Sequence, residues 1–141
     1  MNYQRPLQRT TGYKNFNVGT HQIKIIGVKK TKSSKGNNMF RLFVEGSQGE
    51  KGQYFLTFGT EYTDESLTFL IASIEDGGTD IPDLDFGFNR ATFDFLLNKD
   101  AFIQVEMKEY KGKSQPAITK FLTLDEFEQI EEVEEIIDED W

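Results

Sequence analysis

Two runs of apolar residues, separated by a polar and lysine-containing stretch, dominate residues 23–44. The first run contains Ile23, Ile25, Ile26 and Val28, and the second contains Met39, Phe40, Leu42, Phe43 and Val44. β-Branched and aromatic residues of this kind favour strands. The stretch between them combines lysines with Ser, Gly and Asn, which favour turns. We therefore predict a β-hairpin whose long tip, residues 29–38, is cationic.

The same pattern predicts five strands along the chain. The hairpin supplies the first two, over residues 21–30 and 38–45, and Gly27 predicts a bulge in the first of them. Residues 53–59, 101–110 and 116–122 are expected to form the other three. A turn at Lys111-Gly112-Lys113 joins the last two.

A helix is favoured between the third and fourth strands. An apolar stripe recurs there at the i, i+3, i+4, i+7 spacing that places one helix face in the core. It consists of Leu67, Leu70, Ile71 and Ile74. Thr63 or Asp64 is placed to cap the first turn, and Gly77-Gly78 is expected to end the helix. A short second helical turn is predicted within residues 91–100.

This order of elements, β-β-β-α-β-β, is the connectivity of the OB-fold. We therefore predict a mainly β protein with one or two short helices, built as a five-stranded, partly open barrel. Such barrels bind oligonucleotides or oligosaccharides on strands 2 and 3, and in the loops that join strands 1 to 2 and 4 to 5. In this chain those loops are residues 29–38 and 108–114, and both are basic.

The net charge of −8 hides a strong segregation of charge along the chain. Residues 1–44 hold nine Lys or Arg and no acid, whereas residues 45–107 hold three basic and thirteen acidic residues. Residues 108–124 hold four basic residues and one acid, and residues 125–141 hold ten acids and no base. The pattern predicts a basic N-terminal arm (1–18), an OB domain (19–124) and a disordered acidic tail (125–141). For the arm, disorder is favoured over the alternative that it lies across a ligand.

Basic loops beside an aromatic sheet suit single-stranded nucleic acid, which needs cations for its phosphates and flat rings on which bases stack. The predicted phosphate contacts come from both basic segments and the strand before the first of them: Lys24, Lys29, Lys30, Lys32, Lys35, Lys108, Lys111 and Lys113. The other interpretation of these lysines is that they only keep flexible loops in solution.

Aromatic residues are abundant, with thirteen Phe, five Tyr and one Trp. Alternation places Arg41 and Phe43 on one face of strand 2, and the arginine assigns that face to the surface. In strand 3, Tyr54, Leu56 and Phe58 share a face opposite Phe55 and Thr57, and periodicity leaves open which of the two faces is buried. Tyr54 and Tyr110 are the preferred stacking residues, since a tyrosine hydroxyl tolerates water.

Three local features, taken with the element order, resemble the single-stranded-DNA-binding proteins of bacteria and their phages. They are the Phe58-Gly59 end of strand 3, the Tyr110-Lys111-Gly112-Lys113 hairpin and an acidic tail that closes on an aromatic residue. The resemblance covers residues 20–141 and implies an OB-fold that coats single-stranded DNA during replication, recombination or repair. It also implies that Phe58 stacks on a base.

The resemblance further implies that the tail docks replication or recombination proteins through Asp138, Glu139, Asp140 and Trp141. The usual bacterial ending has Pro before a terminal Phe, whereas Trp141 directly follows Asp140 here, which favours a phage or otherwise divergent member. The residues alone also allow the interpretation that the tail is only a solvated acidic segment. It is also readable as an amphipathic helix that packs back through its apolar positions, Phe127, Ile130, Val133, Ile136 and Ile137. Charge favours a tail that docks partners or competes with DNA for the protein's own cationic groove.

The sequence argues against an enzyme. It has no Cys, so disulfides, thiolate metal sites and Cys-His catalysis are excluded. His21 is the single histidine, and no Gly-rich phosphate loop is present. The best metal candidates, for a two-metal nuclease, are Glu75, Asp76, Asp80, Asp83 and Asp85. Capping of helix ends explains these acids more simply, so we predict no cofactor and no metal.

No stretch approaches the roughly 18 apolar residues of a membrane helix, and the N-terminus has no apolar leader core. We therefore expect a cytoplasmic protein without a membrane partner, in the host cytoplasm if a phage encodes it. A homo-oligomer is compatible with the sequence. The alternative function is a protein-interaction module in which the acidic middle and tail bind a basic partner and the barrel is a scaffold.

Overall fold

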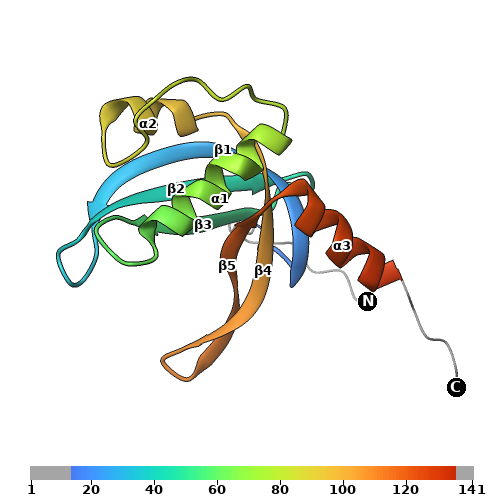
Figure 1. Cartoon of the computed structure of the whole chain (residues 1–141). Coiled ribbons are helices and arrows are strands. Elements are labelled where there is room, and N and C mark those ends of the chain that lie inside the picture. The colour runs from blue at the N-terminus through green and yellow to red at the C-terminus, as the bar shows by residue number, and fades with distance from the viewer. Residues whose placement is uncertain (1–13, 136–141) are drawn as a thin grey trace, which may run out of the picture.

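The computed structural model describes residues 14–135, which form a five-stranded antiparallel sheet and three helices (Figure 1). The strands are β1 (Gly19–Lys32), β2 (Asn38–Gly46), β3 (Lys51–Thr57), β4 (Asp100–Tyr110) and β5 (Lys113–Leu122). Helices α1 (Thr63–Asp76) and α2 (Arg90–Leu96) lie between β3 and β4, and α3 (Leu124–Glu135) follows β5. The predicted order of strands and the helix between the third and fourth are confirmed.

The sheet has the strand order β3-β2-β1-β4-β5. The long β1 pairs with β4 through Gly19–Lys24 and with β2 through Ile23–Lys32. The register with β2 shifts between Ile25 and Gly27, which confirms the predicted bulge. The bulge lets one strand bend enough to serve both halves of the sheet.

Within residues 14–135 no backbone pairing joins the edge strands β3 and β5, so the sheet is not closed into a barrel. The two edges meet through side chains instead. The rings of Tyr54 and Phe121 pack edge to face with their centroids 5.1 Å apart.

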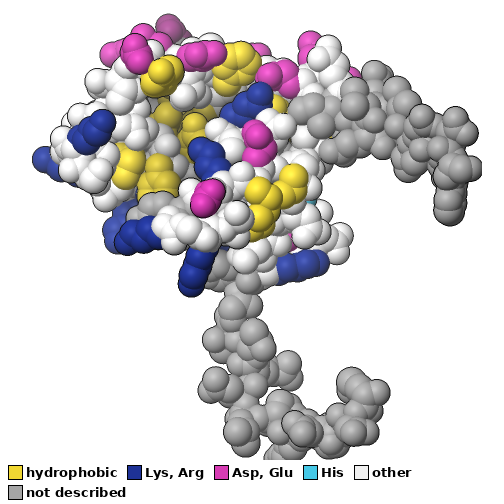
Figure 2. Space-filling model, turned by 90° about the horizontal axis from the view of Figure 1, so that it is seen from below, with side chains coloured by type: hydrophobic (Ala, Val, Ile, Leu, Met, Phe, Trp, Pro, Cys, Tyr) yellow, Lys and Arg dark blue, Asp and Glu magenta, His cyan; other side chains and the backbone are white. Residues whose placement is uncertain are grey.

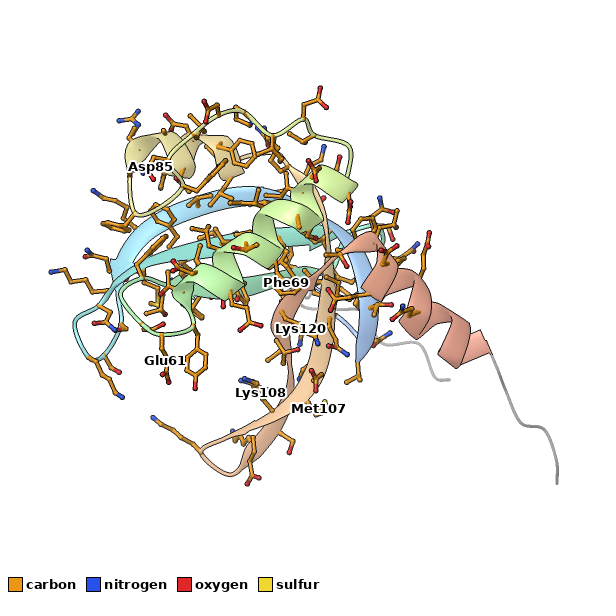
Figure 3. The ribbon with its side chains drawn as sticks, viewed as in Figure 1. Glu61, Phe69, Asp85, Met107, Lys108 and Lys120 are labelled. Carbon is orange, nitrogen blue, oxygen red and sulfur yellow. The ribbon has the colours of Figure 1, made fainter. Side chains whose placement is uncertain are left out.

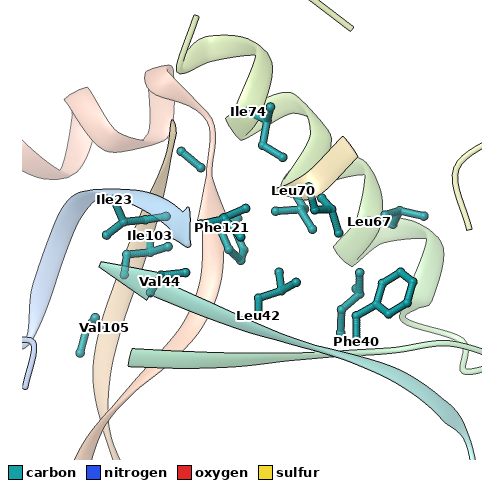
Figure 4. Close-up of a cluster of buried hydrophobic side chains, with 14 of the residues drawn as sticks. Ile23, Phe40, Leu42, Val44, Leu67, Leu70, Ile74, Ile103, Val105 and Phe121 are labelled. Atoms are coloured by element: carbon teal, nitrogen blue, oxygen red, sulfur yellow. The ribbon is translucent and has the colours of Figure 1, made fainter. Parts of the chain in front are cut away.

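The core lies between the inner face of the sheet and α1 (Figure 4). Alternate residues of β2 point into it, and the predicted stripe of α1 covers it. The fully buried residues of this set are Phe40, Leu42, Val44, Leu70 and Ile74. The expected outward face of β2 is confirmed, because Arg41 and Phe43 alternate with these buried positions.

Helix α1 is tied to the sheet at both ends. The Thr63 hydroxyl donates to the carbonyl of Thr57 (2.7 Å), so Thr63 anchors the helix to β3 and does not cap it; the N-cap position is Tyr62. Near the other end, buried Ser73 accepts a hydrogen bond from the Phe102 amide (2.8 Å) and donates one to the Phe102 carbonyl (3.1 Å). Gly77 ends the helix as predicted, where a Cβ would lie 2.1 Å from the carbonyl oxygen of Asp100.

The predicted disordered arm and tail need partial correction. Phe16 is buried, and the Lys51 amide donates to the Lys14 carbonyl (2.8 Å), so residues 14–18 are tied to the sheet. In the acidic segment, residues up to Glu135 form α3, whose Phe127 ring packs 4.8 Å from that of Phe102. This contact is what the amphipathic-helix interpretation predicted for Phe127. None of the helices within residues 14–135 is long and apolar enough to cross a membrane.

Candidate nucleic-acid interface

The outer face of β2 and β3 presents cationic and aromatic side chains side by side. In the register of the two strands, Arg41 lies directly opposite Phe55 and Phe43 lies opposite Gln53. On the other side of β2, Lys29 of β1 is opposite Arg41, and Gly27 is opposite Phe43. Directly opposed residues share a face, so these strands align a lysine, an arginine and a phenylalanine across the sheet.

Arg41 is held in place by three neighbours. Its Nε donates to Oε1 of Gln53 (2.9 Å). Its guanidinium carbon lies 5.0 Å from the centroid of the Phe43 ring and 5.8 Å from that of Phe55. A guanidinium held over two rings is preorganised, and it keeps donors available for a phosphate or a base edge.

Phe55 is the exposed ring at the centre of this face, with half of its surface accessible (50%). Two hollows meet at it. One, of about 340 Å³, runs toward the β1–β2 turn and is lined also by Lys35, Asn37 and Tyr62. The other, of about 290 Å³, runs toward β5 and is lined also by Lys51, Pro116 and Ile118. Together they form a shallow trough, which we call the Phe55 trough.

The Phe55 trough lies between the two predicted binding loops. Figure 2 shows hydrophobic side chains in a hollow with Lys and Arg side chains and a few acidic ones around it, and further acidic side chains gathered along one edge. In Figure 3, Lys108 and Met107 lie on opposite sides of β4, in the hairpin that projects below the sheet, with Lys108 on the side toward Glu61.

Two predicted stacking residues are more buried than Phe55. Phe58 is 8% exposed and packs 5.1 Å from Phe40 and 5.3 Å from Phe88, so its ring belongs to the core. Tyr54 faces inward against Phe121, and this burial raises the pKa of its hydroxyl, while a hydrogen bond with Ser66 acts in the opposite direction. The expectation that the Phe58 ring is presented to bases is therefore wrong, whereas Tyr54 is partly buried and also lines the hollow that runs toward the β1–β2 turn. The exposed ring of β3 is Phe55.

The cationic tip of the first hairpin is shorter than predicted. Strand pairing continues to Lys32 and Asn38, and the turn itself comprises residues 33–37, closed by bonds from Ser33 N to Asn37 O and from Gly36 N to Ser33 O (both 2.9 Å). Gly36 has a φ of +85°, which only glycine adopts readily. Lys35 alone of the predicted lysines lies in the turn. Lys29, Lys30 and Lys32 lie on β1, and alternation directs Lys29 away from the other two.

The second basic hairpin has the predicted turn. Lys111 and Gly112 both have positive φ (51° and 78°), the backbone of a two-residue hairpin turn between Tyr110 and Lys113. Lys108 lies on β4, and Lys108, Lys111 and Lys113 are exposed. The side chain of Tyr110 lies outside the described part of the structure, as do Asp138, Glu139, Asp140 and Trp141.

Most predicted phosphate contacts have no acidic partner among the side chains that the structure describes. The ion pairs between described side chains include Lys51 with Glu45 and Arg90 with Asp94. Exposed lysines outside those pairs include Lys24, Lys29, Lys30, Lys32, Lys35, Lys108 and Lys113. Their charges are therefore available to an anionic ligand.

The acidic metal candidates do not converge. Among residues 14–135 no three His, Asp or Glu side chains are placed to hold a metal ion, so Glu75, Asp76, Asp80, Asp83 and Asp85 form no such group. Asp76 instead accepts a hydrogen bond from the Leu124 amide at the start of α3 (2.8 Å). This is the helix-end role that the simpler interpretation gave these acids.

Sequence reasoning missed two exposed rings of the trough. Phe55 was one of two alternatives, because alternation in β3 defines two faces without saying which is buried. Tyr62, which is 66% exposed at the start of α1, lies outside any strand and carried no pattern. The turn between β2 and β3 sets the register of the two strands, and this register places Phe55 opposite Arg41. That pairing was the signal that Phe55 lies on the outer face.

The chain matches no protein-family model, and no curated protein is significantly similar to it.

Proposed function

We propose that this chain binds and coats single-stranded DNA without strong sequence preference, during replication, recombination or repair, and has no catalytic role. The observation that carries the proposal is the Phe55 trough, in which an exposed ring lies beside the guanidinium of Arg41 and between two lysine-bearing hairpins. Bases stacking on Phe55 would leave their phosphates near Lys29, Lys35 and Lys108.

The proposal also assigns the sheet to the OB-fold. The element order, the bent and bulged β1 and the side-chain contact between β3 and β5 support a barrel left open at that seam. The outer faces of β2 and β3 are where such folds bind single strands. Under the same proposal, residues 138–141 dock partner proteins.

Titration of a fluorescently labelled oligo(dT) with the full chain, followed by anisotropy, tests this function. The account expects binding that weakens steeply with salt and a clear preference for a single strand over a duplex of the same sequence. Absence of binding at low salt would refute it. Binding of a basic partner protein without any oligonucleotide binding would support an interaction module in its place.

A further inference from the structure

A third hollow lies away from the Phe55 trough, between β1 and α2. It has a volume of about 370 Å³, and the residues that matter for its chemistry are Lys29, Lys30, Phe40, Phe88, Arg90 and Phe93. None of these residues lines either hollow of the Phe55 trough. We call it the α2 pocket.

The walls of the α2 pocket are aromatic. The Phe40 ring lies 5.0 Å from that of Phe88, inclined by 32°, and 5.6 Å from that of Phe93, inclined by 71°. Phe88 and Phe93 are only half-buried, so part of each ring faces the opening. Such an arrangement offers both face and edge contacts to a further aromatic ring.

The rim of the α2 pocket is cationic. Lys30 is exposed and belongs to no ion pair within the described residues. The Arg90 side chain is 88% exposed, and among the described residues its ion pair is with Asp94 of the same helix, at 3.3 Å. Exposed pairs of this kind contribute little, so a carboxylate of another chain can replace Asp94.

The pocket also borders a free strand edge. β1 pairs with β4 only as far as Lys24, and one further pair of backbone bonds links Ile25 to residues 98 and 99. From Gly27 to Lys32, in the part of the chain that the structure describes, β1 pairs with β2 on one side and with no strand on the other. A free edge beside a pocket is the arrangement that binds an extended peptide by strand addition.

The geometry points to a docking site for an extended acidic peptide with one aromatic side chain, and we propose that its occupant is residues 136–141 of a second copy of this chain. That segment reads Ile-Ile-Asp-Glu-Asp-Trp. The indole enters the slot formed by the rings of Phe88 and Phe93, and the carboxylates face Lys30 and Arg90. The segment comes from a second copy because α3, which precedes it, lies at the opposite end of the molecule from α2 (Figure 1).

The test uses the full chain and a labelled synthetic peptide of residues 132–141, with binding followed by anisotropy at low and high salt. The account expects saturable, salt-sensitive binding that Arg90→Glu weakens by at least about tenfold. Replacing Trp141 by Ala in the peptide weakens binding by a similar factor, since aromatic anchors dominate such interfaces. Arg90 is exposed, so its variant is expected to fold, which circular dichroism checks.

Lys24→Glu is the matched control, because it reverses the charge of another exposed cationic side chain, on β1 and outside the pocket. The account expects it, like Phe55→Ala, to leave peptide binding unchanged. Absence of peptide binding, or equal losses for Arg90→Glu and Lys24→Glu, would overturn the proposal. Loss of peptide binding in Phe55→Ala would also overturn it, since that result would move the peptide to the Phe55 trough. None of these outcomes depends on whether the protein binds DNA.

Discussion

Arg41 and Phe55 face each other across β2 and β3, with the guanidinium carbon 5.8 Å from the centroid of the half-exposed ring. The pair combines the two contacts that a single strand needs, a cation for the phosphate and a flat surface for the base. Because Gln53 and Phe43 hold Arg41 from its other sides, little side-chain freedom remains to be lost on binding.

Replacing Phe55 by Ala is expected to weaken oligo(dT) binding about 5- to 100-fold, the effect of losing one base–aromatic stack. The stability of the fold should change little, because half of the ring is already in water. The matched control is Phe69→Ala, which removes another partly exposed ring, on α1 and outside the trough. Equal affinities for the wild type and Phe55→Ala would remove Phe55 from the interface.

Changing Lys29, Lys30, Lys32 and Lys35 together to Ala should flatten the plot of log affinity against log salt. Each lost phosphate contact reduces the slope by about 0.7 for a single strand, so the slope falls by up to roughly 3. Alternation along β1 directs Lys29 away from Lys30 and Lys32, so the full reduction requires a strand that wraps around the hairpin. The double variant Lys99→Ala/Lys120→Ala is the control for loss of charge elsewhere. An unaltered slope in the quadruple variant would exclude this hairpin from phosphate contact.

The element order and the helix stripe of this fold could be predicted because they depend on local pattern. Leu67, Leu70 and Ile74 are buried as their spacing predicts, and Gly27 marks the bulge of β1. The closure of the barrel could not be predicted, since it depends on whether the backbones of β3 and β5 come within hydrogen-bonding distance. That distance is set by side chains such as Tyr54 and Phe121, which are far apart in sequence.

The candidate site was predicted less completely than the fold. Turn residues suggested a ten-residue cationic loop, but cross-strand pairing of Lys30 with Phe40 and Lys32 with Asn38 extends both strands. Local composition favoured a loop there, and tertiary pairing overrode it. The preference for Tyr54 as the exposed ring rested on its hydroxyl, whereas the register of β3 with β2 gives that position to Phe55.

Ser73→Ala is expected to destabilise the fold by about 1–3 kcal/mol. The Ser73 hydroxyl hydrogen-bonds to both the amide and the carbonyl of Phe102. Removing the hydroxyl takes this partner away from two buried backbone groups. Urea denaturation measures the change, with Ser34→Ala, an exposed turn serine, as the control. A loss no larger than that of Ser34→Ala would show that α1 does not depend on this contact.

Tyr54 should make the fold sensitive to alkali. Burial raises the pKa of its hydroxyl in the folded state above the value of about 10 that it has in the unfolded chain. Burial of the neutral hydroxyl therefore makes its full contribution to stability below the unfolded pKa. That contribution is lost as the pH rises from there through the higher folded pKa. Wild-type stability should therefore decline more steeply above this pH than that of Tyr54→Phe. In an alkaline titration followed by tyrosinate absorbance, the Tyr54→Phe variant should also show one fewer tyrosine that ionises at the raised pKa. Parallel declines would mean that Tyr54 is not protected from water.

The most direct test of the central claim compares the full chain's affinity for labelled oligo(dT) with its affinity for a duplex of the same length, at two salt concentrations. A cationic trough built around an exposed ring predicts tighter binding of the single strand, and a marked loss of affinity at the higher salt. Equal affinity for the two nucleic acids, or binding of neither at the lower salt, would contradict the account.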